Sequence, residues 1–408
     1  MIMETAKEIL QKGHICDNCL GRQFGQILSG MTNKERGRAL RTALALEYAV
    51  KPFPTEKSNF SMFNFRKGKN PETKEKSRQC FVCGGLFESL EKWAEQAAKK
   101  LQAVECRTFV VSTSLSVSLI RLEEALWEEI GIEHCEPIKS EINRELGKLV
   151  AGRTGKEPDE GKPDVGILLD LERGRLDMQI NPVYVYGRYQ KLVRGIPQTK
   201  WEMYKETVED IIAKPFMRES GGRDHAMHAS GREDIDARCL DWRPFVLEIG
   251  SPMKRTFDLR KMEAEVNRTR KVRVSGLRYS DRKEVVAVKS LMPDKSYRVL
   301  VLPEKPVSLE SLKKLKRISL IKQQTPTRVL HRRADKTRTK RMKSVSWKAL
   351  SGKRLEFTIK GEAGLYIKEL VHGDNGRTRP SFSEVLGVPL KVKELDVVKI
   401  HLPKARRE

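Results

Sequence analysis

The sequence predicts an α+β protein with about two or three domains, in which helices cover mixed β-sheets. Three observations support this prediction. The chain has 408 residues, enough for each domain to bury a core of its own. Segments of alternating apolar residues are interleaved with amphipathic segments of helical period. The glycine-rich stretch "GGRDHAMHASG" lacks the spacing of a phosphate-binding βαβ fingerprint, which argues against a Rossmann or P-loop domain.

The N-terminal part of the chain predicts helices followed by a small mixed unit. Helical periodicity covers residues 33–50 and, after a polar stretch at 55–79, residues 86–104. An alternating run at 109–120 is typical of a strand. The other elements expected here are helices at 122–131 and 138–151 and strands at 164–171 and 176–189. This order of elements indicates a compact α/β domain.

Two C-x-x-C pairs in the N-terminal part have the spacing of a metal site: Cys16 with Cys19, and Cys80 with Cys83. Four thiolates complete a tetrahedral zinc site and leave no open coordination position, so we expect one structural zinc and no catalytic zinc. The alternative is a pair of unrelated reduced knuckles. The other cysteines are isolated and are expected to be ordinary small apolar residues in a reducing, cytoplasmic setting: Cys106, Cys135 and Cys239.

The C-terminal half predicts a sheet backed by helices. Strands are expected at 245–249, 272–280, 284–292, 296–302 and 354–364, and helices at 202–213, 258–268, 307–315 and 381–386. Two basic stretches stand out. Residues 191–201 form a basic loop with glycine and proline as breakers. Residues 317–343 contain ten Lys or Arg and one Asp, a density that favours a phosphate-binding arm over a solvated loop.

The charge of the chain indicates a polyanionic partner. The sequence has 80 Lys or Arg against 55 Asp or Glu, a formal net charge of +25. Neutralising phosphates releases counterions, so we favour nucleic acid over the two alternatives, an acidic membrane surface and simple basic solubility. The sequence contains no apolar run of about 18 residues, so we expect no membrane span.

A cluster of acids interrupts this basic chain at "GREDID", where Glu233, Asp234 and Asp236 follow a glycine and an arginine. Three interpretations are open. The acids can form hydrogen bonds within a turn. They can bind Mg²⁺ for phosphodiester cleavage, with histidines added from "DHAMH" at 224–228. One of them can be a nucleophilic or basic carboxylate held by its arginine neighbours. Spacing alone does not rank the last two.

The stretch "GRED" resembles the G-R-x-D signature of the pseudouridine synthases. The longer stretch "ASGREDIDARCL…RPFVLEI" resembles the archaeal-type tRNA pseudouridine synthases of the Pus10 family, and residues 186–201, 324–333 and 363–387 agree with it, as do the paired C-x-x-C motifs. The resemblance covers nearly the whole chain. It implies a zinc-binding helical region at 1–84, a THUMP-like RNA-binding domain at 85–188 and a catalytic domain at 189–408, whose mixed sheet is mostly antiparallel and flanked by helices.

The resemblance also implies roles for single residues. Asp234 takes the place of the catalytic aspartate, Tyr297 that of the tyrosine which stacks on the target base, and Lys368 that of the basic residue paired with the aspartate. Ile367 and Leu395 resemble the apolar residues lining the base pocket. Residues expected to contact the RNA lie beside the aspartate and in the two basic stretches: Arg232, Arg194, Arg328, Arg332 and Arg333.

The implied activity is the isomerisation of uridine to pseudouridine at positions 54 and 55 of the TΨC arm of tRNA. This reaction needs no cofactor, so zinc would serve structure alone. The THUMP-like domain would bind the acceptor end of the tRNA, and the family implies a monomer. We expect a cytoplasmic protein that is not associated with membranes. Two other functions stay open: a non-catalytic tRNA-binding protein, which would not need Asp234, Tyr297 and Lys368 together, and a metal-dependent ribonuclease.

Overall fold

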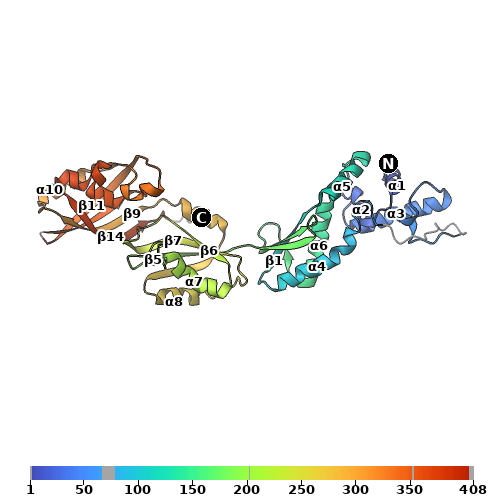
Figure 1. Ribbon diagram of the computed structural model, residues 1–408, viewed down its shortest axis with the longest axis horizontal. Helices are drawn as coiled ribbons and strands as arrows, with labels where there is room; N and C mark the ends of the chain where they lie inside the picture. Colours follow the sequence, from blue (N-terminus) through green and yellow to red (C-terminus); the bar gives the residue numbers. More distant parts are fainter. Residues whose placement is uncertain (1, 67–78, 202, 352, 404–408) are drawn as a thin grey trace. The chain divides into compact units, whose positions relative to one another are not determined.

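The computed structural model describes residues 2–66, 79–201, 203–351 and 353–403, except the side chains of Arg332 and Ser351 (Figure 1). The chain forms two compact units, Met1–Asn181 and Pro182–Glu408. About half of the predicted polar stretch at 55–79, namely residues 67–78, lies outside the described residues. Within the described part of the chain, every helix is too short or too polar to cross a membrane.

The first unit begins with helices that surround the cysteines. These are α1 (Ile2–Lys12), α2 (Asp17–Gly21) and α3 (Asn33–Val50). Thr32 starts α3 with a capping box, in which its hydroxyl accepts from the amide of Glu35 and the Glu35 carboxylate accepts from the amide of Thr32. Helix α3 crosses α2 closely: a Cβ at Gly37 would lie 1.9 Å from the carbonyl oxygen of Asp17. Glycine at this position therefore allows the two backbones to touch.

A four-stranded sheet completes the first unit, in the order β2-β1-β3-β4. Its strands are β1 (Thr108–Ser114), β2 (Glu157–Pro158), β3 (Val165–Asp170) and β4 (Arg175–Ile180), and its helices are α4 (Leu86–Gln102), α5 (Val117–Ile130) and α6 (Ile138–Thr154). The strand expected at 109–120 is shorter than predicted, because Ser116 caps α5 by accepting a hydrogen bond from the amide of Leu119.

The second unit is built on a ten-stranded sheet, in the order β13-β10-β11-β12-β9-β14-β7-β5-β8, with β6 paired to β7. Among the described residues, the β7–β14 pairing is parallel and the others in this sheet are antiparallel. The strands are β5 (Val183–Lys191), β6 (Asp224–Ala229), β7 (Ala237–Gly250), β8 (Val272–Ser280), β9 (Asp294–Pro303), β10 (Leu320–Gln323), β11 (Arg338–Ser351), β12 (Arg354–Gly361), β13 (Thr378–Arg379) and β14 (Leu390–His401).

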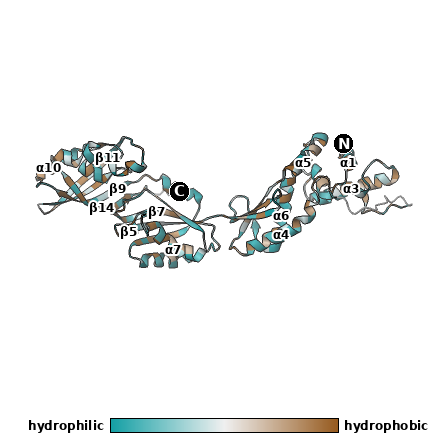
Figure 2. Cartoon of the chain, viewed as in Figure 1, coloured by the Kyte–Doolittle hydropathy of each residue, from teal (hydrophilic) through white to brown (hydrophobic). Residues whose placement is uncertain are grey.

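Helices cover both halves of this sheet. Helices α7 (Val208–Ser220) and α8 (Leu259–Arg268) pack with Phe245 and Leu247 of β7, whereas α9 (Arg282–Ser290) packs with Val246 on the other face. The second half is covered by α10 (Leu309–Lys314), α11 (Ile367–His372) and α12 (Phe382–Leu386). Figure 2 shows helices that are partly teal and partly brown, as expected when one side of a helix is buried.

Several predicted elements differ from the structure. The strand expected at 284–292 is helix α9, because Asp281 caps it and its buried Val285 and Val288 follow a helical period. The helix expected at 202–213 begins later, at Val208, after the capping residue Thr207. The sequence reasoning did not predict β11 or β14, whose many Lys and Arg residues obscure the alternation of strands.

The basic stretch at 317–343 does not form a single arm. It contains β10, the 3-10 helix η4 (Thr327–Arg332) and the first part of β11. Met342 is buried in the core although charged residues surround it in the sequence, since strand geometry turns alternate side chains to opposite faces. Part of this stretch therefore belongs to the large sheet.

The structure divides the chain differently from the predicted domains. The predicted boundary between residues 188 and 189 falls inside β5, which belongs to the large sheet. The boundary between the two compact units lies instead between Asn181 and Pro182 in the sequence. The N-terminal helices and the four-stranded sheet share one apolar core, which includes Leu20, Ile142 and Phe109. The predicted boundary after residue 84 therefore does not separate two independent cores.

Candidate active site

The candidate active site lies where β14 runs parallel to β7, the pairing that joins the two halves of the large sheet. Leu395 is opposite Ala237 and Val397 is opposite Cys239 in this register. A cavity of about 320 Å³ opens here. Side chains from both halves of the sheet line it, among them Asp234, Lys295, Tyr297, Arg328, Ile367, Lys368, Leu395 and Val397. The acidic turn predicted from the sequence therefore opens into a cavity that is lined by both apolar and charged side chains.

Hydrogen bonds to its backbone carbonyl oxygens hold the turn that carries the acids. Gly231 has a φ of +75°, a conformation that favours glycine. The buried ammonium of Lys191 donates hydrogen bonds to the carbonyl oxygens of Asp234 and Ile235, at 3.0 and 2.9 Å. Arg194 donates to the carbonyl oxygen of Asp236 at 3.0 Å. Two cations from the first basic stretch thus hold this turn in place, a role that the sequence did not indicate.

The three acids of the turn differ in their burial and in their contacts with cations. Glu233 is fully buried, 3.1 Å from the guanidinium of Arg243, and it accepts a hydrogen bond from the hydroxyl of Tyr189. Asp236 is exposed and accepts from Lys368 at 2.6 and 2.7 Å. Asp234 lies between these two and faces the cavity. Glu233 is buried in an ion pair and Asp236 is exposed, so Asp234 is the acid of this turn best placed to react with a molecule in the cavity.

Glu233→Gln is expected to lower the free energy of unfolding of the second unit by about 3–5 kcal/mol, because it leaves the buried Arg243 without its counter-charge. Urea unfolding followed by peptide-resolved hydrogen exchange measures this loss. Glu248→Gln is the matched control: Glu248 pairs with His228 at a half-exposed position, and its replacement should cost less than about 1 kcal/mol. Equal losses for the two variants would contradict a structural role for Glu233.

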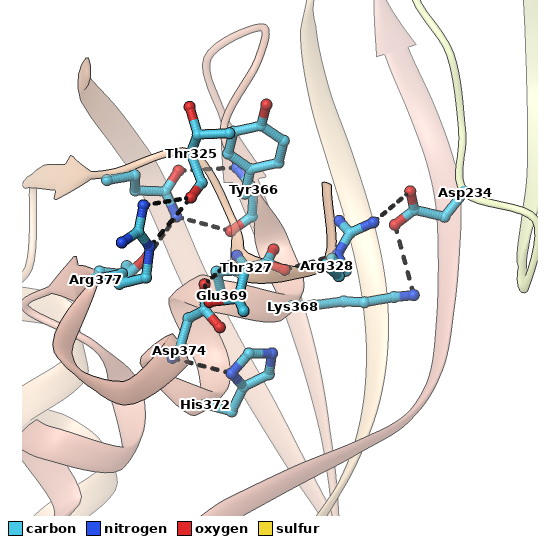
Figure 3. A network of polar contacts seen from close by, with 12 residues as sticks. Asp234, Thr325, Thr327, Arg328, Tyr366, Lys368, Glu369, His372, Asp374 and Arg377 are labelled. Atoms are coloured by element: carbon cyan, nitrogen blue, oxygen red, sulfur yellow. Dashed lines mark hydrogen bonds and ion pairs between the residues drawn. The ribbon is translucent and has the colours of Figure 1, made fainter. Parts of the chain in front are cut away.

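Asp234 is held in the ionised state by two cations. Nη1 of Arg328 donates to Oδ1 of Asp234 at 2.9 Å, and Nζ of Lys368 lies 3.5 Å from Oδ2 (Figure 3). Burial acts to raise the pKa of Asp234, but the charges of Arg328 and Lys368 outweigh it and hold the pKa below its usual value. The carboxylate is therefore negatively charged at neutral pH although its side chain is only 29% exposed.

A polar network fixes Arg328. Its Nε donates to Glu369 Oε1 at 2.7 Å, and Glu369 is buried in α11 next to Lys368. Thr327, the residue before Arg328, donates from its amide to Asp374 at 2.8 Å. Figure 3 shows these contacts between η4 and the segment around α11. Arg328 is thus anchored at both ends of its guanidinium, and it is a closer partner of Asp234 than Lys368, which the sequence analysis had paired with the aspartate.

The apolar residues predicted for the base pocket lie in the cavity wall. Tyr297 from β9, Ile367 from α11 and Leu395 from β14 all line it and are largely buried. Burial raises the pKa of Tyr297 to about 12, so its ring stays a neutral phenol at physiological pH. The structure therefore brings Asp234, Tyr297, Lys368, Ile367 and Leu395 together around one cavity.

The arginines expected to contact RNA have diverse positions. Arg232 and Arg333 are exposed at the cavity, where Arg333 also donates to the hydroxyl of Tyr366 at 2.8 Å. Arg194 lies outside the lining of the cavity and is bound by protein groups, including Asp396 at 2.7 Å. Arg328 pairs with Asp234 and Glu369, as described above. The side chain of Arg332 lies outside the described residues.

The structure does not support the magnesium interpretation of the acidic turn. In the described parts of the chain, four cysteines form the one group of side chains arranged to hold a metal ion. The histidines of "DHAMH" belong to strand β6 and have carboxylate neighbours of their own: His225 lies beside Glu209, and His228 bonds Glu248 at 2.7 Å. The acids of the turn are bound to cations instead of converging on a common point.

The four cysteines of the two C-x-x-C pairs come together in the first unit. Their sulfur atoms all lie within 4.8 Å of one another, although the pairs are far apart in the sequence. The amide of Cys19 donates to Sγ of Cys16 at 3.4 Å, and the buried Arg41 holds the segment before Cys16 through the carbonyl oxygen of Ile15. Four thiol groups at this separation, three of them on buried cysteines, fit a tetrahedral metal ion, which would bind their thiolates.

Two buried cations of the cavity, Arg243 and Lys295, were not predicted as site residues from the sequence. Arg243 is fully buried and belongs to an ion pair, and Lys295 lies two residues before Tyr297 on β9. A lysine and a tyrosine at alternating positions share one face of a strand. The sequence "KSY" could therefore have predicted that Lys295 lies on the same face of the strand as Tyr297.

Two family descriptions and several curated proteins match this chain. "Pus10, C-terminal" matches residues 184–401 and "Pus10 THUMP domain, archaeal" matches residues 93–170. The chain is 39% identical to a tRNA pseudouridine synthase Pus10 from Methanothrix thermoacetophila, over 98% of this chain and 94% of that protein. It is 37% identical to one from Pyrococcus furiosus, over 98% of each. A chain of a solved Cbf5-Nop10-Gar1 complex has a TM-score of 0.32 and 16% identity, covering 52% of this chain and 48% of that one.

Proposed function

The chain belongs to the Pus10 family of tRNA pseudouridine synthases, and on this premise we propose that it isomerises uridine to pseudouridine in tRNA with Asp234 as the reacting carboxylate. The observation that carries this proposal is the ionised carboxylate of Asp234 in the same cavity as the neutral ring of Tyr297. A cavity of about 320 Å³ has the size of small-molecule sites, so a single nucleotide base is a suitable occupant.

The target uridine must leave its stack to reach Asp234, which costs a few kcal/mol. The ring of Tyr297 supplies a new stacking surface, and such contacts contribute about 1–3 kcal/mol per base. Ile367 and Leu395 exclude water from the other walls. Arg328 and Lys368 keep Asp234 ionised, so that it can attack the nucleotide or accept a proton. The isomerisation needs no external electron or group donor, and therefore no catalytic cofactor.

We further propose positions 54 and 55 in the TΨC arm as the targets, and the first unit as the part that binds the acceptor end of tRNA. The match of residues 93–170 to an archaeal THUMP domain supports this role for the first unit. The formal charge of +25 supports binding to an RNA backbone. We expect a cytoplasmic monomer, and zinc as the structural metal of the cysteine cluster, since four thiolates suit this ion.

The test is pseudouridine mapping on an unmodified tRNA transcript. The purified protein, without added cofactor, is incubated with the transcript, and pseudouridine is located by carbodiimide treatment and primer extension. We expect stops at positions 54 and 55, and the loss of one stop when the corresponding uridine is replaced by cytidine. Tight tRNA binding without any stop would favour the non-catalytic binding protein, and cleaved transcript would favour a ribonuclease.

Arg328→Met is expected to lower the single-turnover rate by about 100-fold. Since the charge of Arg328 lowers the pKa of Asp234, its removal should raise that pKa, so the rate should begin to fall at a higher pH upon acidification than in the wild type. Rate measurements between neutral and acidic pH test this shift. Lys368→Met should act in the same direction. Arg354→Met, at an exposed position of β12, is the control. If Arg328→Met and Arg354→Met showed the same dependence of the rate on pH, Arg328 would not be the residue that lowers the pKa of Asp234.

A further inference from the structure

Lys295 occupies a position where an apolar residue is expected. On β9, every second side chain faces the core, and Tyr297, Val299 and Val301 on this face are all buried. Lys295 continues the same row and is only 8% exposed. Lysine is rarely buried to this degree unless an acid is paired with it.

Lys295 has no paired acid in the part of the chain that the structure describes. Among the described residues, its ammonium makes neither a hydrogen bond nor an ion pair, and it lines the cavity that contains Asp234. A Cβ at Gly231 would lie 2.9 Å from Nζ of Lys295 and 3.2 Å from Nη1 of Arg243, so both cations lie against the acidic turn. Arg243 forms an ion pair with Glu233 at 3.1 Å. The charge of Lys295 is thus available to a group that enters the cavity.

Burial is costly for this side chain. It lowers the pKa of Lys295 to about 8, and the neighbouring charge of Arg243 acts in the same direction. A cation in such surroundings weakens the folded state relative to an apolar side chain of similar size. Positions that lower stability in this way are frequent at functional sites.

We propose that the ammonium of Lys295 donates a hydrogen bond to a carbonyl oxygen of the target uracil and stabilises the negative charge that this oxygen acquires during the reaction. This inference rests on the proposed function. Lys295 and Tyr297 lie side by side on one face of β9. When a base stacks on the ring of Tyr297, the edge of that base therefore lies close to the side chain of Lys295.

The proposal holds for both routes open to Asp234. If its carboxylate attacks C1′, an O–C1′ bond forms, the C1′–N1 bond breaks, and the electron pair stays on the uracil, whose O2 and O4 share the charge. If the carboxylate adds to C6, an O–C6 bond forms and the electrons of the C5=C6 bond move to O4 as an enolate. In each case a carbonyl oxygen becomes negative, and a fixed donor stabilises that state more than the uncharged base.

The burial of Lys295 favours the base over a phosphate as its partner. A phosphate carries a full charge, and its removal from water into a buried position is costly. More exposed cations lie at the same cavity, where a phosphate can keep part of its hydration: Arg232, Lys289 and Arg333. Lys295 is as buried as Tyr297, since each is 8% exposed.

The experiment compares Lys295→Met with the wild type on a tRNA transcript labelled with tritium at C5 of its uridines, because pseudouridine formation releases this hydrogen. We expect the single-turnover rate to fall about 100-fold or more, as for the loss of an oxyanion donor. The affinity for tRNA should stay within about threefold, since it depends mainly on phosphate contacts. The unfolding temperature should stay the same or rise, which a merely structural lysine would not produce.

Lys360→Met is the matched control. Lys360 lies on β12 opposite Ser296 of β9, on the other face of the sheet from Lys295, and its replacement should leave the rate unchanged. A second arm uses transcripts with sulfur in place of O2 or O4 of the target uracil. The effect of Lys295→Met should be smaller on one of these two substrates, because sulfur is the weaker acceptor. Full activity of Lys295→Met, or equal effects on all three substrates, would overturn this inference, whereas an inactive wild type would overturn the proposed function instead.

Discussion

Asp234→Asn is expected to lower the single-turnover rate of pseudouridine formation by more than about 1,000-fold, while the dissociation constant for tRNA changes by less than about threefold. Asparagine has nearly the same shape and can still accept the hydrogen bond from Arg328, so the turn should keep its structure. It lacks the negative charge that a nucleophile or base needs. Tritium release from C5 measures the rate, and filter binding at fixed salt measures the affinity.

Asp236→Asn is the matched control for this prediction. Asp236 lies in the same turn and bonds Lys368, but its side chain is 67% exposed. We expect its replacement to reduce the rate by no more than about tenfold, because it acts on Asp234 only through Lys368. An active Asp234→Asn protein would contradict the assignment of the reacting carboxylate. Equal losses in the two variants would assign the activity to the turn as a whole.

The second large effect is expected at the cysteine cluster. Cys80→Ser should abolish stoichiometric metal binding and unfold much of the first unit, because structural zinc sites contribute about 10–16 kcal/mol of binding free energy to small folds. The cluster contacts the shared core of this unit, in which Cys19, Cys80 and Val82 are buried. Elemental analysis of the purified protein identifies the metal, and hydrogen exchange of peptides from the first unit reports its unfolding.

Cys106→Ala is the control for the loss of a buried sulfur. Cys106 belongs to the same core but lies outside the cluster of four sulfur atoms, so its replacement should keep the metal and cost only about 1–2 kcal/mol. If Cys80→Ser retained both the metal and the exchange protection of the first unit, the cluster would not be a structural metal site.

The local sequence predicted those features that depend on a few neighbouring residues. Helix α3 occupies the residues expected from its period, and α8, α10 and α12 lie close to their predicted positions. Strands were harder to predict. Helix α9 was predicted as a strand because its three valines have high strand propensity. In the structure, the capping by Asp281 outweighs this propensity. Strands β11 and β14 were not predicted because charged side chains occupy their exposed face.

The sequence by itself determined the family, the pairing of the C-x-x-C motifs as one candidate metal site, and the residues Asp234, Tyr297 and Lys368 as one group. The C-x-x-C spacing predicts the metal site, whereas the resemblance of the local motifs to a known family implies the grouping of Asp234, Tyr297 and Lys368. The tertiary structure alone decided which cation faces which acid. Arg328 binds Asp234, which lies 94 residues away in the sequence, and Arg243 pairs with Glu233 in the core. Among the described residues, Lys295 at the cavity forms no ion pair. Ion pairs of this kind depend on how distant strands pack together, because an electrostatic contact acts over a few ångströms of space whatever the separation along the chain.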